Sequence, residues 1–341
     1  MNRERLVWAD ALKGWLALLV IFGHALQFGI ENCNEDYIWN LIYSAHMPAF
    51  FAISGFLAFK GPNAPIPNWG KAITRRMKQL LLPFFVWTVI DFCTHDYGWS
   101  HIKDYFLHPD CMYWFLWTLF FIYLIFISVE TLSRRINIST DIPIIIVCLL
   151  LSLSMIVFNY REFGFQFIAY YFLFYAFGFF INKYNLLIKN KAILLALTIV
   201  WLLAAYFWRM DSAPTFVSPD SFIPQTLWLY SYRFAVAVVG VVVLMSFAAQ
   251  NINLLNSENK LVKLGVYSLG SYVVQLLFIP WVVSIIRSLF YGDSDVSIVL
   301  VSFGVTAIIS VAVISILNMN RITALFCLGK ITRSNSINKN V

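Results

Sequence analysis

Charged residues are scarce in this chain of 341 residues: only 12% are Asp, Glu, Lys or Arg, whereas 60% are hydrophobic. Soluble globular domains carry about 25% charged residues, so the composition excludes a soluble protein as the main class. The mean hydropathy of +0.75 and the aromatic content of 18% are typical of a chain that crosses lipid–water interfaces many times. The sequence therefore predicts an all-α, polytopic membrane protein.

Cysteine is also scarce, and the five cysteines form no Cys-x-x-Cys pair. This spacing gives no indication of a zinc or redox motif, so no metal site is predicted. Cys33 and Cys111 both fall in loops predicted to face outward, where disulfides persist. They are the candidate pair for a disulfide between the first and second outer loops.

Long polar segments are missing, and ten apolar runs are long enough to cross a bilayer, which takes roughly 20 residues. They lie near residues 8–29, 38–59, 79–98, 113–133, 142–159, 163–182, 191–208, 228–249, 266–290 and 296–318. The first run is no signal peptide, because Asp10 and Lys13 interrupt it and no cleavage site follows. We expect one membrane domain over residues 1–320 and a polar, disordered cytoplasmic tail over residues 321–341.

Lys and Arg fall mainly on one side of this arrangement, whereas the loops on the other side are acidic, with Glu31, Glu35, Asp36, Asp96, Asp104, Asp110, Asp211, Asp220, Asp293 and Asp295. Because positively charged loops stay in the cytoplasm, both termini are predicted to be cytoplasmic. The expected location is a bacterial-type cytoplasmic membrane. The net charge of +7 is then a topology signal, and no nucleic-acid partner is predicted.

Ionisable residues within the predicted spans are few, and they are Asp10, Lys13, His24, His46, Asp91, Glu130 and Arg233. Each is costly in lipid and is therefore a functional hypothesis. Lys13 and His24 are eleven residues apart, which places them on nearly the same face of a helix and roughly 16 Å apart along its axis. Asp10 is close enough to Lys13 for an ion pair, and that pair alone is one interpretation of both residues.

Two histidines are predicted to reach the same depth on neighbouring antiparallel helices. Counted from Ala11, His24 lies roughly 20 Å from the inner boundary of the apolar core, and His46, counted from Trp39, lies at a similar level. One interpretation is a pair of neutral histidines that link helices by hydrogen bonds. The other is general acid–base chemistry, for which histidine is the usual residue.

A basic segment, "KAITRRMKQLLLP", precedes the third predicted span and holds Lys71, Arg75, Arg76 and Lys78. Juxtamembrane cations commonly bind anionic lipid headgroups, which is one explanation. Arg75 and Lys78 also share a face of a regular α-helix. The sharper hypothesis is a phosphate-binding site.

Four motifs in order, "DALKGWLALLVIFGHA", "HMPAFFAISGF", "RRMKQLLLPFFVW" and "YWFLWTLFF", resemble the acyltransferase-3 family of integral membrane proteins, especially its fucose 4-O-acetylase branch. The resemblance implies O-acyl transfer from cytoplasmic acetyl-CoA to a carbohydrate hydroxyl. The family's basic residue and histidine correspond to Lys13 and His24. Its paired arginines correspond to Arg75 and Lys78, where lysine is a departure, and Arg76 is an alternative partner. Gln275 stands where many members have histidine.

The resemblance also implies a division of roles. Lys13, Arg75, Arg76 and Lys78 would hold the phosphates of acyl-CoA, and His24 would act as a general base or as a transient acyl carrier. His46 would bind the acceptor or stabilise an oxyanion. Asp91 would orient an imidazole or simply link two helices, and Trp114 and Arg233 are the candidate acceptor-binding residues, although Trp114 also suits interfacial anchoring.

Two other classes of protein remain open at this point. A transporter or flippase of a glycan or lipid-linked precursor would use the histidines as a proton relay. A membrane sensor or scaffold would have no use for a buried histidine pair. The acceptor, the acyl chain and the oligomeric state are not readable from the sequence.

Overall fold

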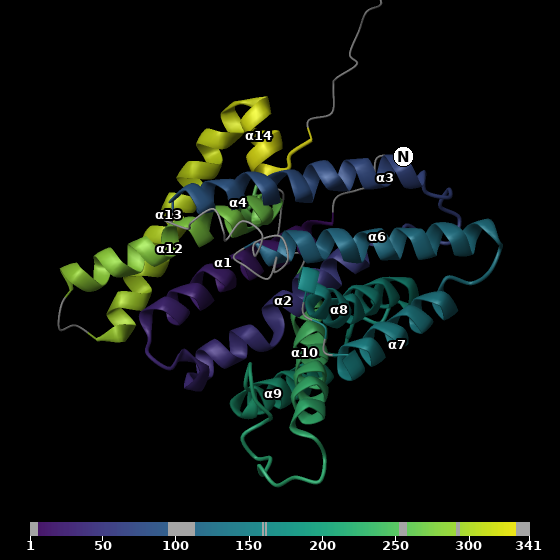
Figure 1. Ribbon diagram of the computed structural model, residues 1–341, viewed down its shortest axis with the longest axis horizontal. Helices are drawn as coiled ribbons and strands as arrows, with labels where there is room; N and C mark the ends of the chain where they lie inside the picture. Colours follow the sequence, from purple (N-terminus) through teal and green to yellow (C-terminus); the bar gives the residue numbers. More distant parts are fainter. Residues whose placement is uncertain are drawn as a thin grey trace, which may run out of the picture.

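A computed structural model describes residues 6–94, 113–158, 160, 162–251, 258–290 and 294–331. Within these ranges every regular element is a helix, which confirms the predicted all-α class (Figure 1). The described helices are α1 (Val7–Gly29), η1 (Cys33–Glu35), α2 (Tyr37–Ala58), α3 (Trp69–Arg76), η2 (Met77–Leu81), α4 (Leu82–Thr94), α6 (Trp114–Arg135), α7 (Asp141–Phe158), η3 (Glu162–Gly164), α8 (Phe165–Tyr184), α9 (Lys191–Phe207), α10 (Gln225–Gln250), α11 (Lys260–Val266), α12 (Ser268–Leu289), α13 (Asp295–Met319) and α14 (Arg321–Leu328).

Nine helical segments in the described ranges are long and apolar enough to cross a membrane. They coincide with nine of the ten predicted spans. The remaining one, predicted over 191–208, is α9, an apolar helix over Lys191–Phe207 that falls below the length of the others. The chain is thus a multi-pass membrane protein, and a total of ten crossings stays a prediction.

The third predicted span begins earlier than the sequence indicated. The basic segment and the apolar run form one continuous helical segment, Trp69–Thr94, in which η2 is a π-helical turn between α3 and α4. Pro83 explains the position of this turn, because its ring lacks an N–H and collides with the carbonyl of the residue four positions earlier, Gln79. Figure 1 shows the segment running alongside α6, against which α3 and η2 pack.

The centre of the molecule is built around α1 and α2. The first of these helices packs against α2, α10, α11, α12 and α13, and the second packs most extensively against α8. Gly55 of α2 and Gly178 of α8 allow this approach, because a Cβ atom at either glycine would collide with the backbone of the other helix. Small residues permit such close packing of membrane helices, where apolar side chains gain nothing over lipid.

The segment predicted to be a disordered tail starts with an ordered helix instead. Residues Arg321–Leu328 form α14, which packs against α4 and η2. The indole Nε1 of Trp87 donates to the carbonyl oxygen of Cys327 at 2.8 Å. Gly329 ends the helix with a positive φ of 63° and lies against the backbone of Gln79. The apolar side of "ITALFCL" accounts for this packing, which continues the ordered structure beyond residue 320.

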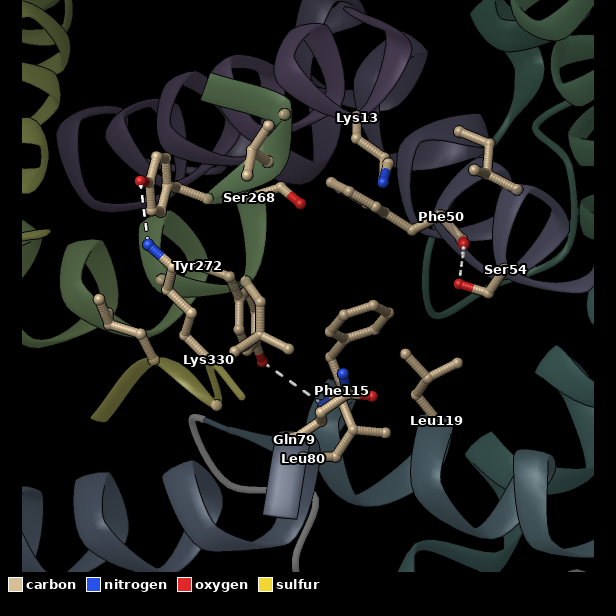
Figure 2. A pocket seen from close by; sticks show the side chains of 18 of the residues that line it. Lys13, Phe50, Ser54, Gln79, Leu80, Phe115, Leu119, Ser268, Tyr272 and Lys330 are labelled. Atoms are coloured by element: carbon tan, nitrogen blue, oxygen red, sulfur yellow. Dashed lines mark hydrogen bonds between the residues drawn. The ribbon is translucent and has the colours of Figure 1, made fainter. Parts of the chain in front are cut away.

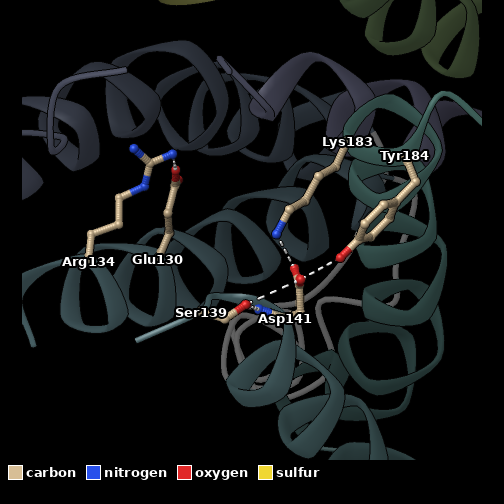
Figure 3. Close-up of polar contacts among 6 residues, drawn as sticks. All are labelled: Glu130, Arg134, Ser139, Asp141, Lys183 and Tyr184. Carbon is tan, nitrogen blue, oxygen red and sulfur yellow. Dashed lines mark hydrogen bonds and ion pairs between the residues drawn. The ribbon is translucent and has the colours of Figure 1, made fainter. Parts of the chain in front are cut away.

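At the basic end of the bundle, hydrogen bonds and an ion pair join α7 to α8, and a second ion pair lies within α6. Asp141 of α7 accepts hydrogen bonds from Lys183 and Tyr184 at the end of α8, and Glu130 pairs with Arg134 one turn along α6 (Figure 3). Cys33 lies in η1 at the opposite end, half-buried. Its proposed partner, Cys111, lies outside the described residues, so that disulfide stays a prediction.

Candidate active site

A cavity of about 610 Å³ opens between α1, α2, η2, α6, α12 and the residues that follow α14. We call it the basic cavity, because four cations line it: Lys13, Arg75, Arg76 and Lys330. Figure 2 shows Lys13 extending from α1 toward Gln79 and Leu80 of η2 on the far side. A carboxylate, Asp10, pairs with Lys13 at 2.7 Å.

The cations of the basic cavity come from three distant parts of the chain. Arg76 stacks over the ring of Tyr123, with its guanidinium carbon 4.8 Å from the ring centroid. Lys330 donates to the side-chain oxygen of Asn318 at 2.7 Å and lies over the ring of Tyr267. A side cavity of about 420 Å³ shares Arg75 and Arg76 with the basic cavity and adds Lys60 and Lys71, together with one carboxylate, Glu130, which pairs with Arg134. The positive charge therefore surrounds a space large enough for a ligand with several phosphates.

A second cavity, of about 340 Å³, is lined by four residues that the sequence singled out: His24, His46, Trp114 and Arg233. We call it the histidine cavity. These residues come from α1, α2, α6 and α10, so the fold brings together side chains that lie more than 200 positions apart.

The two cavities follow each other along the bundle and share Met47 and Tyr272. On α1 the basic cavity contacts Lys13 and the histidine cavity contacts His24, roughly 16 Å further along the axis. The order along α12 is the same: Ser268 lines the basic cavity, Tyr272 lines both cavities, and Leu276 lines the histidine cavity. The side chains of Met47 and Tyr272 thus form the partition between a cation-lined space and a histidine-lined space.

The His24 ring is held by Gln275 of α12. The amide of Gln275 meets Nδ1 of His24 through Oε1 at 3.2 Å or through Nε2 at 3.0 Å, so this contact suits either tautomer of the ring. Gln275 is fully buried, and its Nε2 also lies 3.3 Å from the carbonyl oxygen of Tyr272. With Nδ1 engaged in this way, Nε2 is the ring atom left for chemistry.

The tautomer of His46 is fixed by its own helix. Its Nδ1 lies 2.7 Å from the carbonyl oxygen of Ile42, which can only accept a hydrogen bond, so Nδ1 carries the proton. In the neutral ring, Nε2 is then an acceptor. This arrangement suits a contact with a hydroxyl group, whereas stabilising an oxyanion would require a second proton on the ring.

Aromatic rings form one wall of the histidine cavity. Trp114 stacks on Phe167 and Tyr171, with ring centroids 4.6 and 5.2 Å apart. Arg233 reaches the same cavity from α10, donates to the carbonyl oxygen of Met210 at 2.9 Å and lies over the ring of Trp208. Stacked rings beside a polar group are typical of sites for amphipathic ligands such as sugars.

Two of the residues assigned to the phosphate, catalytic or acceptor sites line neither cavity. Lys78 lies in the π-helical turn η2 and is exposed, because the wider turn breaks the three-residue register with Arg75. Asp91 is buried in α4 and does not line the histidine cavity. Their proposed roles in phosphate binding and imidazole orientation therefore gain no support from the geometry.

Sequence reasoning missed Lys330 and Tyr272 and gave Gln275 no role. Lys330 was hidden in a segment whose polar composition indicated a tail, although the apolar run before it was a usable signal. Gln275 of α12 contacts His24 of α1. Tyr272, three residues earlier, packs edge-on against Phe115 of α6. Only the packing of these helices identifies their contacts.

A family model described as an acyltransferase domain matches residues 6–317. The chain therefore belongs to the acyltransferase-3 family. It is 30% identical over 167 residues to nodulation protein NolL of Sinorhizobium fredii, across 45% of this chain and 44% of that protein. The nodulation protein NolL of Mesorhizobium japonicum is also 30% identical, over 137 residues, across 37% of this chain and 36% of its own.

The match spans less than half the length of both of these curated relatives. No solved structure matches the chain.

Proposed function

We propose that this acyltransferase moves an acyl group, most simply acetyl, from cytoplasmic acyl-CoA to a hydroxyl of a carbohydrate on the outer side of a bacterial cytoplasmic membrane. The observation that carries the proposal is the stacking of the basic cavity on the histidine cavity with a shared partition. The negatively charged end of the donor and the hydroxyl of the acceptor thus have separate places, on either side of Met47 and Tyr272.

The basic cavity suits the nucleotide end of acyl-CoA. Arg75 and Arg76 offer planar forks for charge-assisted hydrogen bonds to phosphate, and Lys13 and Lys330 add point charges around them. Phosphates stay at the membrane surface, because charged groups are costly in lipid. The uncharged pantetheine arm then extends past Leu119 and Phe50 toward Met47 and Tyr272.

In the histidine cavity, the acceptor hydroxyl attacks the thioester carbonyl carbon. Nε2 of His24 takes the hydroxyl proton as the new C–O bond forms, and the C–S bond then breaks. The protonated His24 returns the proton to the departing thiolate, so the products are an ester and free CoA. His46 holds the acceptor through its unprotonated Nε2, and the Trp114 wall supports a sugar ring.

This assignment predicts a sided reaction, which sealed proteoliposomes of one protein orientation test directly. Radiolabelled acetyl-CoA is supplied only to the face that carries Lys13 and Arg75, with glycan acceptors on the opposite face. Transfer of label to glycan across the sealed membrane is the expected result. Transfer only when donor and acceptor share one face would contradict the proposal. In cells, mass spectrometry of surface glycans with and without the protein should reveal the lost acyl ester and so identify the acceptor.

A further inference from the structure

The histidine cavity contains a cation whose charge the described chain leaves unneutralised. Arg233 donates to a backbone carbonyl, that of Met210, and its guanidinium lies 5.4 Å from the ring centroid of Tyr170. Among the described residues, no carboxylate lines this cavity and none forms an ion pair with Arg233. An arginine at this depth normally pairs with an anion, because its charge is costly in an apolar environment.

Two buried N–H groups beside this charge also lack acceptors. They are Nε of Arg233 and the indole Nε1 of Trp208, and the Trp208 side chain is only 2% exposed. Both residues line the histidine cavity. A buried donor without a partner costs free energy, which a bound acceptor atom recovers. A positive charge with two unmet donors therefore fits a ligand that brings negatively charged oxygen atoms.

The other described arginines at this end of the bundle have no buried N–H group that lacks an acceptor. Arg209 donates to the carbonyl oxygens of Tyr206 and Trp208, and Arg287 donates to that of Gly29 and lies 3.9 Å from a carboxylate oxygen of Asp295. Neither lines the histidine cavity. Among the described arginines, a buried N–H group without an acceptor is thus found only in Arg233, at the cavity that holds His24 and His46.

Building on the proposed acyl transfer, we propose that the acceptor is an anionic saccharide, recognised through a carboxylate or phosphate group by Arg233 and Trp208. Its sugar ring lies against Trp114 and presents a hydroxyl to His24. The cavity volume of about 340 Å³ is at the small end of the range for ligand sites, about 300–1,000 Å³, and suits one or two sugar units.

Binding measurements on the full-length protein in lipid nanodiscs test this inference without acyl-CoA. The probes are methyl β-D-glucoside, methyl β-D-glucuronide and methyl β-D-glucoside 6-phosphate, compared at equal ionic strength by saturation-transfer NMR. We expect at least one anionic glycoside to bind about tenfold more tightly than the neutral one, since charge-assisted hydrogen bonds are the stronger kind. The tighter of the two anionic probes identifies the group as carboxylate or phosphate.

Variants locate the preference in the cavity. Arg233→Gln should abolish it, and Trp208→Phe, which keeps a ring but loses the N–H, should reduce it. Arg233→Lys keeps the charge without the planar fork and should retain part of the preference, which covers the case in which Arg233→Gln fails to fold. Arg209→Gln is the matched control and should leave the preference intact.

Equal binding of charged and neutral glycosides, or no binding of any of them, would overturn the inference. So would a preference that survives in a folded Arg233→Gln protein. The binding measurement needs neither acyl-CoA nor turnover. Its result can therefore be interpreted even if the proposed transfer reaction is not observed.

Discussion

Gln275 Nε2 lies 3.0 Å from Nδ1 of His24, across the interface between α12 and α1. Because Nδ1 makes this contact, Nε2 is the ring nitrogen that remains available for proton transfer. His24 lines the same cavity as His46. Residue counting predicts the depth of His24, and the fold adds the orientation of its ring.

The role of His24 is tested by separating binding from turnover. His24→Ala should lower the rate of transfer by about 10²–10⁴-fold, the usual contribution of a positioned general base. Acyl-CoA affinity should be unchanged, because the phosphates bind in the basic cavity. Both are measured on purified protein, by calorimetry and by transfer of label. His24→Gln forms hydrogen bonds but cannot carry the proton at neutral pH, so a well-folded His24→Gln protein with near-normal activity would disprove the catalytic role.

Gln275 is expected to act by positioning His24. Gln275→Leu keeps the approximate size of the side chain but removes the contact with Nδ1, and kcat should fall about tenfold or more while acyl-CoA affinity is retained. Gln275→His offers a ring nitrogen in its place and should recover part of the loss. Equal kcat values for Gln275→Leu and the wild type would show that the contact serves only helix packing.

Single charge-neutralising substitutions test which cations contribute to acyl-CoA binding. Arg75→Gln, Arg76→Gln and Lys330→Gln should each weaken acyl-CoA binding about tenfold or more by removing charge-assisted contacts to phosphate. Lys78→Gln should have little effect, because that side chain does not line the basic cavity.

Lys263→Gln serves as the matched control for these substitutions, since Lys263 lies at the same end of the molecule and pairs with Glu258. Calorimetry with CoA provides the measurement. A larger loss for Lys78→Gln than for Lys330→Gln would contradict the arrangement seen here.

The α2–α8 interface predicts a stability difference between two glycine substitutions. Gly178→Ala places a Cβ against the backbone of Ala52 and should destabilise the protein by about 1–3 kcal/mol or more, the usual range for overpacking. Gly304→Ala on α13 meets no atom within 4 Å and should be tolerated. Thermal unfolding in detergent compares them, and equal melting temperatures would show that the two helices can separate at no cost.

Much of the fold follows from the sequence because lipid constrains it strongly. Apolar runs of sufficient length must become helices that satisfy their own hydrogen bonds, so nine spans were located to within a few residues, apart from the start of the third. The early start at Trp69 depends on Asn68, whose side chain accepts a hydrogen bond from the backbone N–H of Lys71, and the π-helical turn depends on Pro83. The packing of α14 depends on a surface of α4 and η2 that no local pattern reveals.

The candidate site was predictable in its chemistry but not in its partners. His24, His46 and Arg233 stand out because ionisable groups in lipid are rare, and the structure brings them to one cavity. Lys78 was assigned by the three-residue spacing of a regular helix, which η2 interrupts. Lys330 and Tyr272 line the cavities, and Gln275 contacts His24, only because segments far apart in the chain pack together. Those contacts have no signature in the local sequence.

The π-helical turn also affects how this chain compares with its relatives. A turn of this kind holds one residue more than an α-helix of the same rise, so the extra residue is absorbed locally and the flanking helices keep their places. A relative that lacks one residue between positions 77 and 81 would then still present two arginines to the basic cavity. If such a relative were aligned to this chain without a gap, its arginines would be offset by one position from Arg75 and Arg76. The equivalent arginines should therefore be identified by superposing structures.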